Sequence, residues 1–324
     1  MLELLTKPIR VNTLELRNRI VMPPMATGKA DHGMPDDGLV AYYADRAKGT
    51  GLIIVEHEYI SPEGMAHGTQ LSMADDAVVP AYQKLTAAIH AQGAAVFAQL
   101  SHAGAKAQDS GLPALSPSGI HPQNAEQTSE VMSPDDIARI KDCFVSAAMR
   151  AKQAGFDGVE IHSAHGYLLN QFYSPLTNHR TDAYTGSTLE GRTRLHVEVL
   201  QAVRAALGPE YPIAIRFGAY DYMEGGSKKE EIAEASRIFA EAGADLLDIS
   251  GGLNGFTVKG NTQPGWFSEL SIPAKKNVTV PVMLTGGVKT TEEAETLLHE
   301  GAADLIGIGR AMLVNPHWSE EAIG

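Results

Sequence analysis

Two histidines and a tyrosine stand close together at the end of one predicted strand. The segment Gly158–His162 is short, apolar and partly β-branched, as a buried strand would be, and His165 and Tyr167 follow it closely. Two imidazole N–H groups and a phenolic O–H that face one space can bind a carbonyl oxygen and deliver a proton. Because three such polar groups would be costly in a hydrophobic core, their spacing indicates the active site of an enzyme.

The three-residue spacing of His162 and His165 is also compatible with a metal site. Zinc requires at least one further protein ligand and hydrogen-bonding groups behind its histidines. Asp248 could supply a ligand, but no other side chain pairs with it convincingly. We therefore predict no metal site, and a metal-dependent barrel hydrolase that uses His162 and His165 stays as the alternative of another class.

Short apolar segments alternate along the chain with longer amphipathic segments. The predicted strands are Arg19–Met22, Leu52–Glu56, Ala94–Leu100, Gly158–His162, Ile213–Phe217, Leu246–Ser250, Val282–Thr285 and Leu305–Ile308. The predicted helices between them include Val79–Gln92, Pro134–Ala154, Leu189–Leu207, Lys228–Ala242 and Thr291–Glu300. Strands buried on both faces that alternate with helices are typical of a (β/α)8 TIM barrel, an α/β fold. No G-x-G-x-x-G motif follows the first strand to favour a doubly wound sheet, so we predict a single barrel domain over residues 1–324.

The loops at the carboxyl ends of the strands build the active site of such a barrel. The residues of interest that lie there are Pro24, Met25, Ala26, Gln99, Arg216, Gly286, Gly287, Gly309 and Arg310. The glycines after the last two strands let backbone N–H groups approach an anion, and Arg310 adds a guanidinium, so we predict a phosphate site there. Tight turns are the alternative for the glycines, and an ion pair with Glu160 or Asp248 is the alternative for Arg216.

Charge and composition exclude several classes of partner. The chain of 324 residues carries a formal net charge of -13, which repels nucleic acid and anionic membrane surfaces. Its one cysteine, Cys143, cannot form an internal disulfide or a thiolate metal site. We find neither a signal-peptide pattern nor an apolar run of about 20 residues, so we expect no membrane partner and a cytoplasmic location.

Ordered motifs extend over nearly the whole chain. They are Asn18–Met25, Tyr43–Ala47, Gln99–Gly104, Leu115–Ser118, the segment from Asn178 to Arg192, and Leu305–Pro316. In these motifs the chain resembles the Old Yellow Enzyme family of FMN-dependent ene reductases. The resemblance implies a barrel that holds FMN without a covalent bond, takes electrons from NADPH or NADH, and reduces the C=C bond of α,β-unsaturated carbonyl compounds. The resemblance is also compatible with a homo-oligomer.

The resemblance also implies a role for each candidate residue. His162 and His165 would bind the carbonyl oxygen of an enone-type substrate, and Tyr167 would give a proton to its α-carbon. The residues implied at the cofactor are Gln99 and Arg216 on the pyrimidine edge of the flavin, Gly286, Gly287, Gly309 and Arg310 on the phosphate, and Pro24, Met25, Ala26 and His57 beside the ring.

Three positions depart from the family pattern. Ala26 stands where Thr or Cys is common beside the flavin, and His57 stands where Ala or Gly is usual. Ala105 replaces an expected arginine, although Lys106 follows in register. Two further alternatives therefore stay open. One is a flavin reductase or dienoyl-type reductase with another acceptor, and the other is a flavin-binding protein whose ene-reductase activity has been lost.

Overall fold

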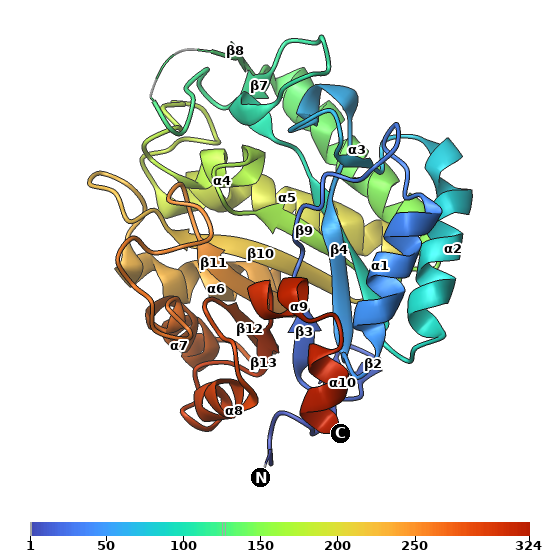
Figure 1. The fold of residues 1–324 in the computed structure, drawn as a ribbon. Coiled ribbons are helices and arrows are strands. Elements are labelled where there is room, and N and C mark those ends of the chain that lie inside the picture. The colour runs from blue at the N-terminus through green and yellow to red at the C-terminus, as the bar shows by residue number, and fades with distance from the viewer. Residues whose placement is uncertain (1, 125, 127) are drawn as a thin grey trace.

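The computed structural model describes residues 2–124, 126 and 128–324, and within them eight parallel strands close into a barrel surrounded by helices (Figure 1). The barrel strands are β3 (Ile20–Met22), β4 (Leu52–Tyr59), β6 (Ala95–Ser101), β9 (Gly158–Ser163), β10 (Ile213–Tyr220), β11 (Leu246–Gly251), β12 (Val282–Thr285) and β13 (Leu305–Gly307). Each pairs with the next, and β13 pairs with β3 and β3 with β4, which closes the ring. The predicted (β/α)8 TIM barrel is confirmed.

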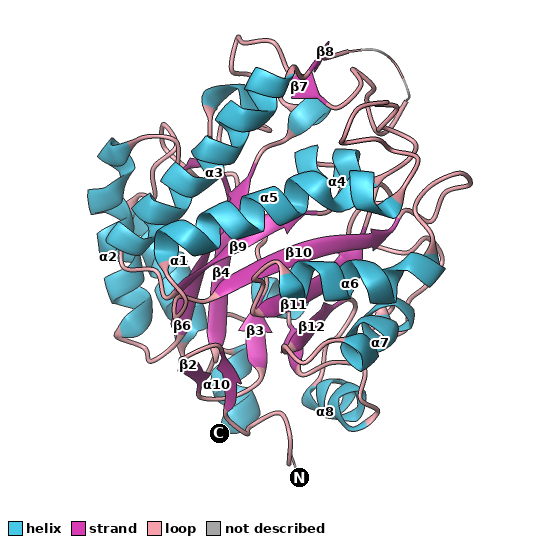
Figure 2. Cartoon of the chain, turned by 180° about the vertical axis from the view of Figure 1, so that it is seen from behind, coloured by secondary structure: helices cyan, strands magenta, loops and turns pink. Residues whose placement is uncertain are grey.

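Helices cover the outer face of the strands, as Figure 2 shows for α5 and α6. The longer helices are α1 (Asp37–Ala47), α2 (Val79–His90), α3 (Pro134–Gln153), α5 (Leu189–Leu207), α6 (Ile232–Glu241), α7 (Ser268–Asn277) and α8 (Thr291–His299). The shorter ones are α4 (Leu168–Tyr173), α9 (Arg310–Val314) and α10 (Trp318–Ile323). At the start of α3, the Ser133 side chain accepts from the backbone of Asp136, and the Asp136 carboxylate accepts in return. No described helix is long and apolar enough to cross a membrane.

Short elements complete the fold. They are strands β1 (Ile9–Val11), β2 (Leu14–Leu16), β5 (Leu71–Ser72), β7 (Leu115–Ser116) and β8 (Glu130–Val131), and 3-10 turns at Pro62–Gly64, Asp76–Val78, Gly104–Lys106 and Lys229–Glu231. The β1–β2 hairpin packs Val11 and Leu16 against inward-facing barrel residues such as Leu52 and Phe97. This hairpin therefore closes the barrel opposite the carboxyl ends of the strands.

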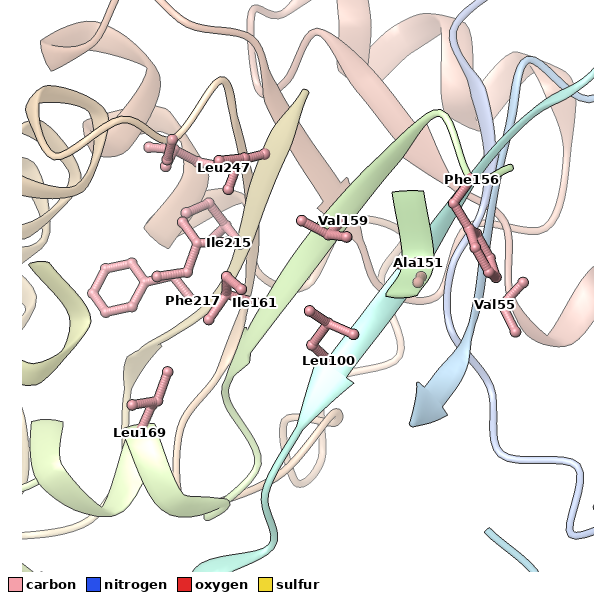
Figure 3. Close-up of a cluster of buried hydrophobic side chains, with 14 of the residues drawn as sticks. Val55, Leu100, Ala151, Phe156, Val159, Ile161, Leu169, Ile215, Phe217 and Leu247 are labelled. Atoms are coloured by element: carbon pink, nitrogen blue, oxygen red, sulfur yellow. The ribbon is translucent and has the colours of Figure 1, made fainter. Parts of the chain in front are cut away.

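Side chains on successive strand residues alternate between the two faces of the barrel wall. Val159 and Ile161 of β9 belong to the larger core between strands and helices, and so do Ile215 and Phe217 of β10 (Figure 3). The residues between them therefore face the barrel interior. This alternation directs polar side chains from the carboxyl-terminal half of several strands into the barrel interior.

The strand predictions agree with the structure except at their ends. Strand β4 continues to Tyr59, three residues beyond the predicted end, and β10 continues to Tyr220. Both extensions contain a change of register with a neighbouring strand. His57 therefore lies inside β4, whereas the predicted strand end at Glu56 would place it in the loop that follows.

Candidate active site

Four inward-facing polar side chains form a layer across the barrel interior. Gln99 of β6 donates from Nε2 to Oε1 of Glu160 on β9 at 2.8 Å. Arg216 of β10 lies beside Asp248 of β11, with 3.3 Å between Nε and Oδ2. Burial, reinforced by the charge of Asp248, raises the pKa of Glu160 to about 8. Glu160 is therefore a neutral donor or acceptor at neutral pH, and the one close charge pair in this layer is Arg216 with Asp248.

An ion pair with Glu160 or Asp248 was the alternative role predicted for Arg216, and the structure contains the pair with Asp248. This ion pair does not satisfy the guanidinium: Arg216 is only 4% exposed to solvent, and Nε, although 3.3 Å from Asp248, makes no hydrogen bond in the described part of the chain. A buried guanidinium in this state has a strong tendency to bind a carbonyl or an anion. Arg216 is therefore available to a ligand above the layer.

His162, His165 and Tyr167 are brought together, as the sequence predicts. The ring centroids of His162 and His165 are 5.2 Å apart, and those of His162 and Tyr167 are 5.0 Å apart. His165 adopts a left-handed backbone conformation, with φ of 59°. This turn reverses the chain after β9, so that both imidazoles and the phenol reach the same space.

Two neighbouring residues fix the orientation of His165. Its Nε2 lies 2.8 Å from the hydroxyl oxygen of Ser250 at the end of β11. Its backbone oxygen accepts from Nζ of Lys106 at 3.1 Å. The Lys106 ammonium also lies 5.1 Å from the centroid of the Tyr167 ring. One cation therefore supports the turn and stands beside the phenol.

The protonation states of these groups follow from burial. Burial and the neighbouring imidazole of His165 hold the pKa of His162 well below its usual range, and burial and Arg216 do the same for His165. Burial raises the pKa of Tyr167 to about 12. At neutral pH the site therefore presents two neutral imidazoles and a protonated phenol, which are hydrogen-bond donors without a net charge.

The structure offers little support for a metal at the two histidines. Within the described residues no group of three or more His, Cys, Asp or Glu side chains is placed to hold a metal ion. Asp248, the third ligand that the sequence offered, lies against Arg216 instead. Ser250 is already bonded to Nε2 of His165.

The glycines after β12 and β13 lie side by side because those two strands pair. A Cβ on Gly286 would lie 2.7 Å from Nε1 of Trp266, and one on Gly287 would lie 2.7 Å from Cζ3 of the same ring. The guanidinium carbon of Arg310 lies 4.9 Å from the Trp266 ring. These glycines therefore form a cradle without side chains, with an arginine and an indole beside it.

The residues after β3 lie next to this glycine cradle, because β13 pairs with β12 on one side and with β3 on the other. A Cβ on Gly309 would lie 3.3 Å from Sδ of Met25. Pro24 and Met25 are partly buried, and Ala26 is exposed. The hydroxyl of Thr27, the next residue along the chain, is directed to Glu56, where it donates to Oε1 at 2.6 Å.

His57 stands at the opposite side of the cluster, next to Tyr167. The ring centroids of His57 and Tyr167 are 5.6 Å apart, and Nδ1 of His57 lies 2.6 Å from Nε2 of Gln70. The side chain is half-buried and not turned away into the packing.

Sequence reasoning missed several residues of the site. They are Gln70, Ser250, Phe256 and Trp266, of which Phe256 is 68% exposed and has its ring 6.1 Å from that of His165. The period of two along β11 could have indicated Ser250, because it faces inward two residues after Asp248. Nothing in the local pattern marks the other three.

Residues 4–323 match the model of the NADH:flavin oxidoreductase / NADH oxidase family, and the chain belongs to that family. It is an oxidoreductase family that uses FMN, with NADH or NADPH as the reductant in relatives. The resemblance to the Old Yellow Enzyme family that the sequence motifs indicated is confirmed.

Individual relatives agree with this assignment. The chain is 38% identical to the NADH oxidase of Thermoanaerobacter brockii over 97% of its length, but it spans only 50% of that larger protein. It is 36% identical to the NADPH dehydrogenase of Halalkalibacterium halodurans, covering 96% of this chain and 91% of the relative. The solved structure of the old yellow enzyme homologue from Zymomonas mobilis superposes with a TM-score of 0.83 at 31% identity, covering 98% and 93% of the two chains.

Proposed function

We propose that this chain reduces the C=C bond of α,β-unsaturated carbonyl compounds, with NADPH or NADH as the source of electrons. The observation that carries the proposal is the group of three neutral donors, His162, His165 and Tyr167, around one space. When bound, FMN supplies the hydride chemistry that no amino-acid side chain can perform. The remaining steps belong to the residues of the chain.

The residues present fit an FMN molecule. Arg216 and Gln99 would hold the polar edge of its ring, because the buried guanidinium has an unused donor and Gln99 is anchored by Glu160. Gly286, Gly287 and Gly309 would hold the phosphate with backbone N–H groups, since side chains there would collide with their neighbours or narrow the cradle. Arg310 would add its guanidinium to the same oxygens.

His162 and His165 would bind the carbonyl oxygen of the substrate. As the double bond is reduced, negative charge develops on that oxygen, and fixed N–H donors stabilise it more than they stabilise the uncharged ketone. Their low pKa values keep the imidazoles neutral, so the barrel interior gains no additional buried charge. Ser250 holds His165 in place for this task.

Tyr167 would give its proton to the α-carbon. Its pKa of about 12 keeps the phenol protonated across the physiological range. The Lys106 ammonium, 5.1 Å from the ring, would stabilise the phenolate that remains after transfer. A general acid of this kind contributes about 10²- to 10⁴-fold in rate.

One anaerobic experiment tests the proposal. Purified protein that has been mixed with FMN and then freed of unbound cofactor is expected to absorb at about 450 nm, the property of the bound cofactor itself. It should lose that absorbance when NADPH or NADH is added, and regain it when 2-cyclohexenone is added. Protein that retains no FMN, or that is never reoxidised by an enone, would contradict the proposal.

A second candidate is a flavin-dependent reductase or oxidase with a different acceptor. A relative at 38% identity is named an NADH oxidase, and Ala26 and His57 depart from the usual residues beside the flavin. Rapid reoxidation by oxygen without reoxidation by any enone would favour this candidate.

A further inference from the structure

His57 lies on a β-bulge at the mouth of the barrel. Val55 of β4 pairs with Ala98 of β6, whereas Glu58 pairs with Leu100, so three steps along β4 match two steps along β6. A bulge of this kind redirects the side chains within it. It places the His57 ring beside Tyr167, with 5.6 Å between the ring centroids.

The proton of His57 can be assigned from its neighbour Gln70. The backbone N–H of Ala66 donates to Oε1 of Gln70 at 2.6 Å, which turns the amide nitrogen of Gln70 toward His57. That nitrogen lies 2.6 Å from Nδ1 of His57 and 3.2 Å from the backbone oxygen of His57. Because an amide N–H₂ only donates, Nδ1 must accept, and the hydrogen of the neutral ring is on Nε2.

The ring is also held neutral. Burial, together with the positive potentials from His67 and Lys106, lowers the pKa of His57 to about 3. Gln70 is itself buried and is held by Ala66 and Ser101, so the tautomer cannot change by a simple rotation of the amide. His57 is therefore a fixed N–H donor on the edge of the ring that faces away from Gln70, and not a general base.

The position of this donor differs from that of the histidine pair. Strands β4 and β9 are separated by β6, so His57 and His162 come from strand ends about 10 Å apart. The Tyr167 ring contacts both imidazoles. A double bond placed beneath the Tyr167 hydroxyl would therefore have the histidine pair toward one end and His57 toward the other.

We propose that His57 is a substrate-specificity residue that binds a second oxygen, so that the site prefers alkenes with a carbonyl group at both ends of the double bond. The inference rests on the proposed function, because it takes His162 and His165 as the binding site of the first oxygen. Ene-diones and cyclic imides have this chemistry, whereas a simple enone leaves the His57 donor without a partner.

The experiment compares a one-carbonyl and a two-carbonyl acceptor in the FMN-loaded protein. The probes are 2-methylcyclohexenone and 4-oxoisophorone, and the quantity is the ratio of their kcat/KM values. In His57→Ala and His57→Phe this ratio is expected to shift toward the simple enone by about fivefold, the effect of one lost neutral hydrogen bond. The matched control is His90→Ala, which removes an imidazole that lies 2.8 Å from Asp157, at the other end of the barrel, and should leave the ratio at its wild-type value.

Binding without turnover gives a second measurement. The dissociation constant of the saturated two-carbonyl product, measured by calorimetry on the oxidised protein, should rise in His57→Ala more than that of the saturated one-carbonyl product. If His57→Ala still reduces both acceptors, and both the kcat/KM ratio and the relative affinities are unchanged, the specificity role of His57 is refuted while the proposed function stands. Failure of the wild-type protein to reduce either acceptor would instead refute the proposed function.

The tautomer is tested independently of activity. In protein labelled with ¹⁵N-histidine, the resonances lost in His57→Ala should belong to a neutral ring with its proton on Nε2 between pH 5 and 8. A proton on Nδ1, or a ring that becomes charged in this range, would overturn the inference that His57 is a fixed donor.

Discussion

Nε2 of His165 lies 2.8 Å from the hydroxyl oxygen of Ser250, so that the turn after β9 is tied to the end of β11. The two residues are 85 positions apart in the chain, and the barrel makes them neighbours across the intervening strand β10. This contact holds one of the two imidazoles proposed to bind the substrate oxygen.

Replacing Ser250 by Ala should therefore weaken the binding of the substrate oxygen. We expect kcat/KM for an enone to fall by about five- to tenfold, because an imidazole without its anchor samples other orientations. Ser163→Ala is the matched control, since Ser163 makes the equivalent 2.8 Å bond to His196 on the outer face of β9. It should lower the free energy of unfolding by about 1 to 3 kcal/mol and leave the kinetics intact.

Tyr167→Phe should separate the two half-reactions. Without the hydroxyl, reoxidation of the cofactor by an enone should slow by about 10²- to 10⁴-fold, while its reduction by NADPH or NADH should change little. Anaerobic stopped-flow absorbance records each step by itself. An equal loss in both half-reactions would show that Tyr167 shapes the site and is not the proton donor.

Arg216→Met should affect both the affinity and the redox potential of FMN. A positive charge at the polar edge of the ring stabilises the reduced, more negative cofactor, so its loss should lower the midpoint potential. A change of about 30 mV in a two-electron couple corresponds to about 1.4 kcal/mol, the scale of one charge-assisted hydrogen bond. Arg310→Ala should weaken FMN binding but leave the potential unchanged, because we place Arg310 at the phosphate. Equal potentials in the wild type and Arg216→Met would contradict the placement of Arg216.

Gly286→Ala should impair cofactor binding through a steric conflict. The new Cβ would lie 2.7 Å from Nε1 of Trp266, so the indole, which has the Arg310 guanidinium 4.9 Å from its ring, would have to shift. We expect at least a tenfold weaker affinity for FMN, measured by the quenching of flavin fluorescence. Gly38→Ala in α1 is the control, since its Cβ meets only ordinary contacts with the Asp36 side chain and should leave FMN affinity unchanged.

His196 should make stability depend on pH in the acidic range. It is buried, and burial lowers its pKa to about 3. Below the unfolded pKa of about 6.5 the unfolded chain binds a proton that the folded chain does not, so stability falls as the pH drops from 6.5 toward 3. This histidine should cost about 2 kcal/mol between pH 6.5 and pH 5. Urea unfolding at both pH values should show that His196→Gln loses correspondingly less stability than the wild type, and an identical loss would contradict the assignment.

The barrel, and the position of most candidate residues at one end of it, could be predicted from the sequence. A period of two along each strand places Gln99, Arg216 and Asp248 on the inner face, because successive side chains must point in opposite directions. The carboxyl ends of parallel strands meet at one edge, so His162 and the glycines after β12 and β13 had to face the same space. These features depend on local backbone geometry and on burial, and both are visible in the order of apolar and polar residues within one segment.

How those residues are held could not be predicted from the sequence, because it depends on contacts made only in the folded chain. Trp266 packs on Gly286, and Gln70 lies 2.6 Å from Nδ1 of His57, through contacts between segments that carry no common pattern in the sequence. The end of β4 was predicted three residues too early because the bulge at His57 depends on its pairing with β6. Orientation, tautomer and charge depend on the neighbours that a side chain meets across the barrel, and the folded chain alone supplies them.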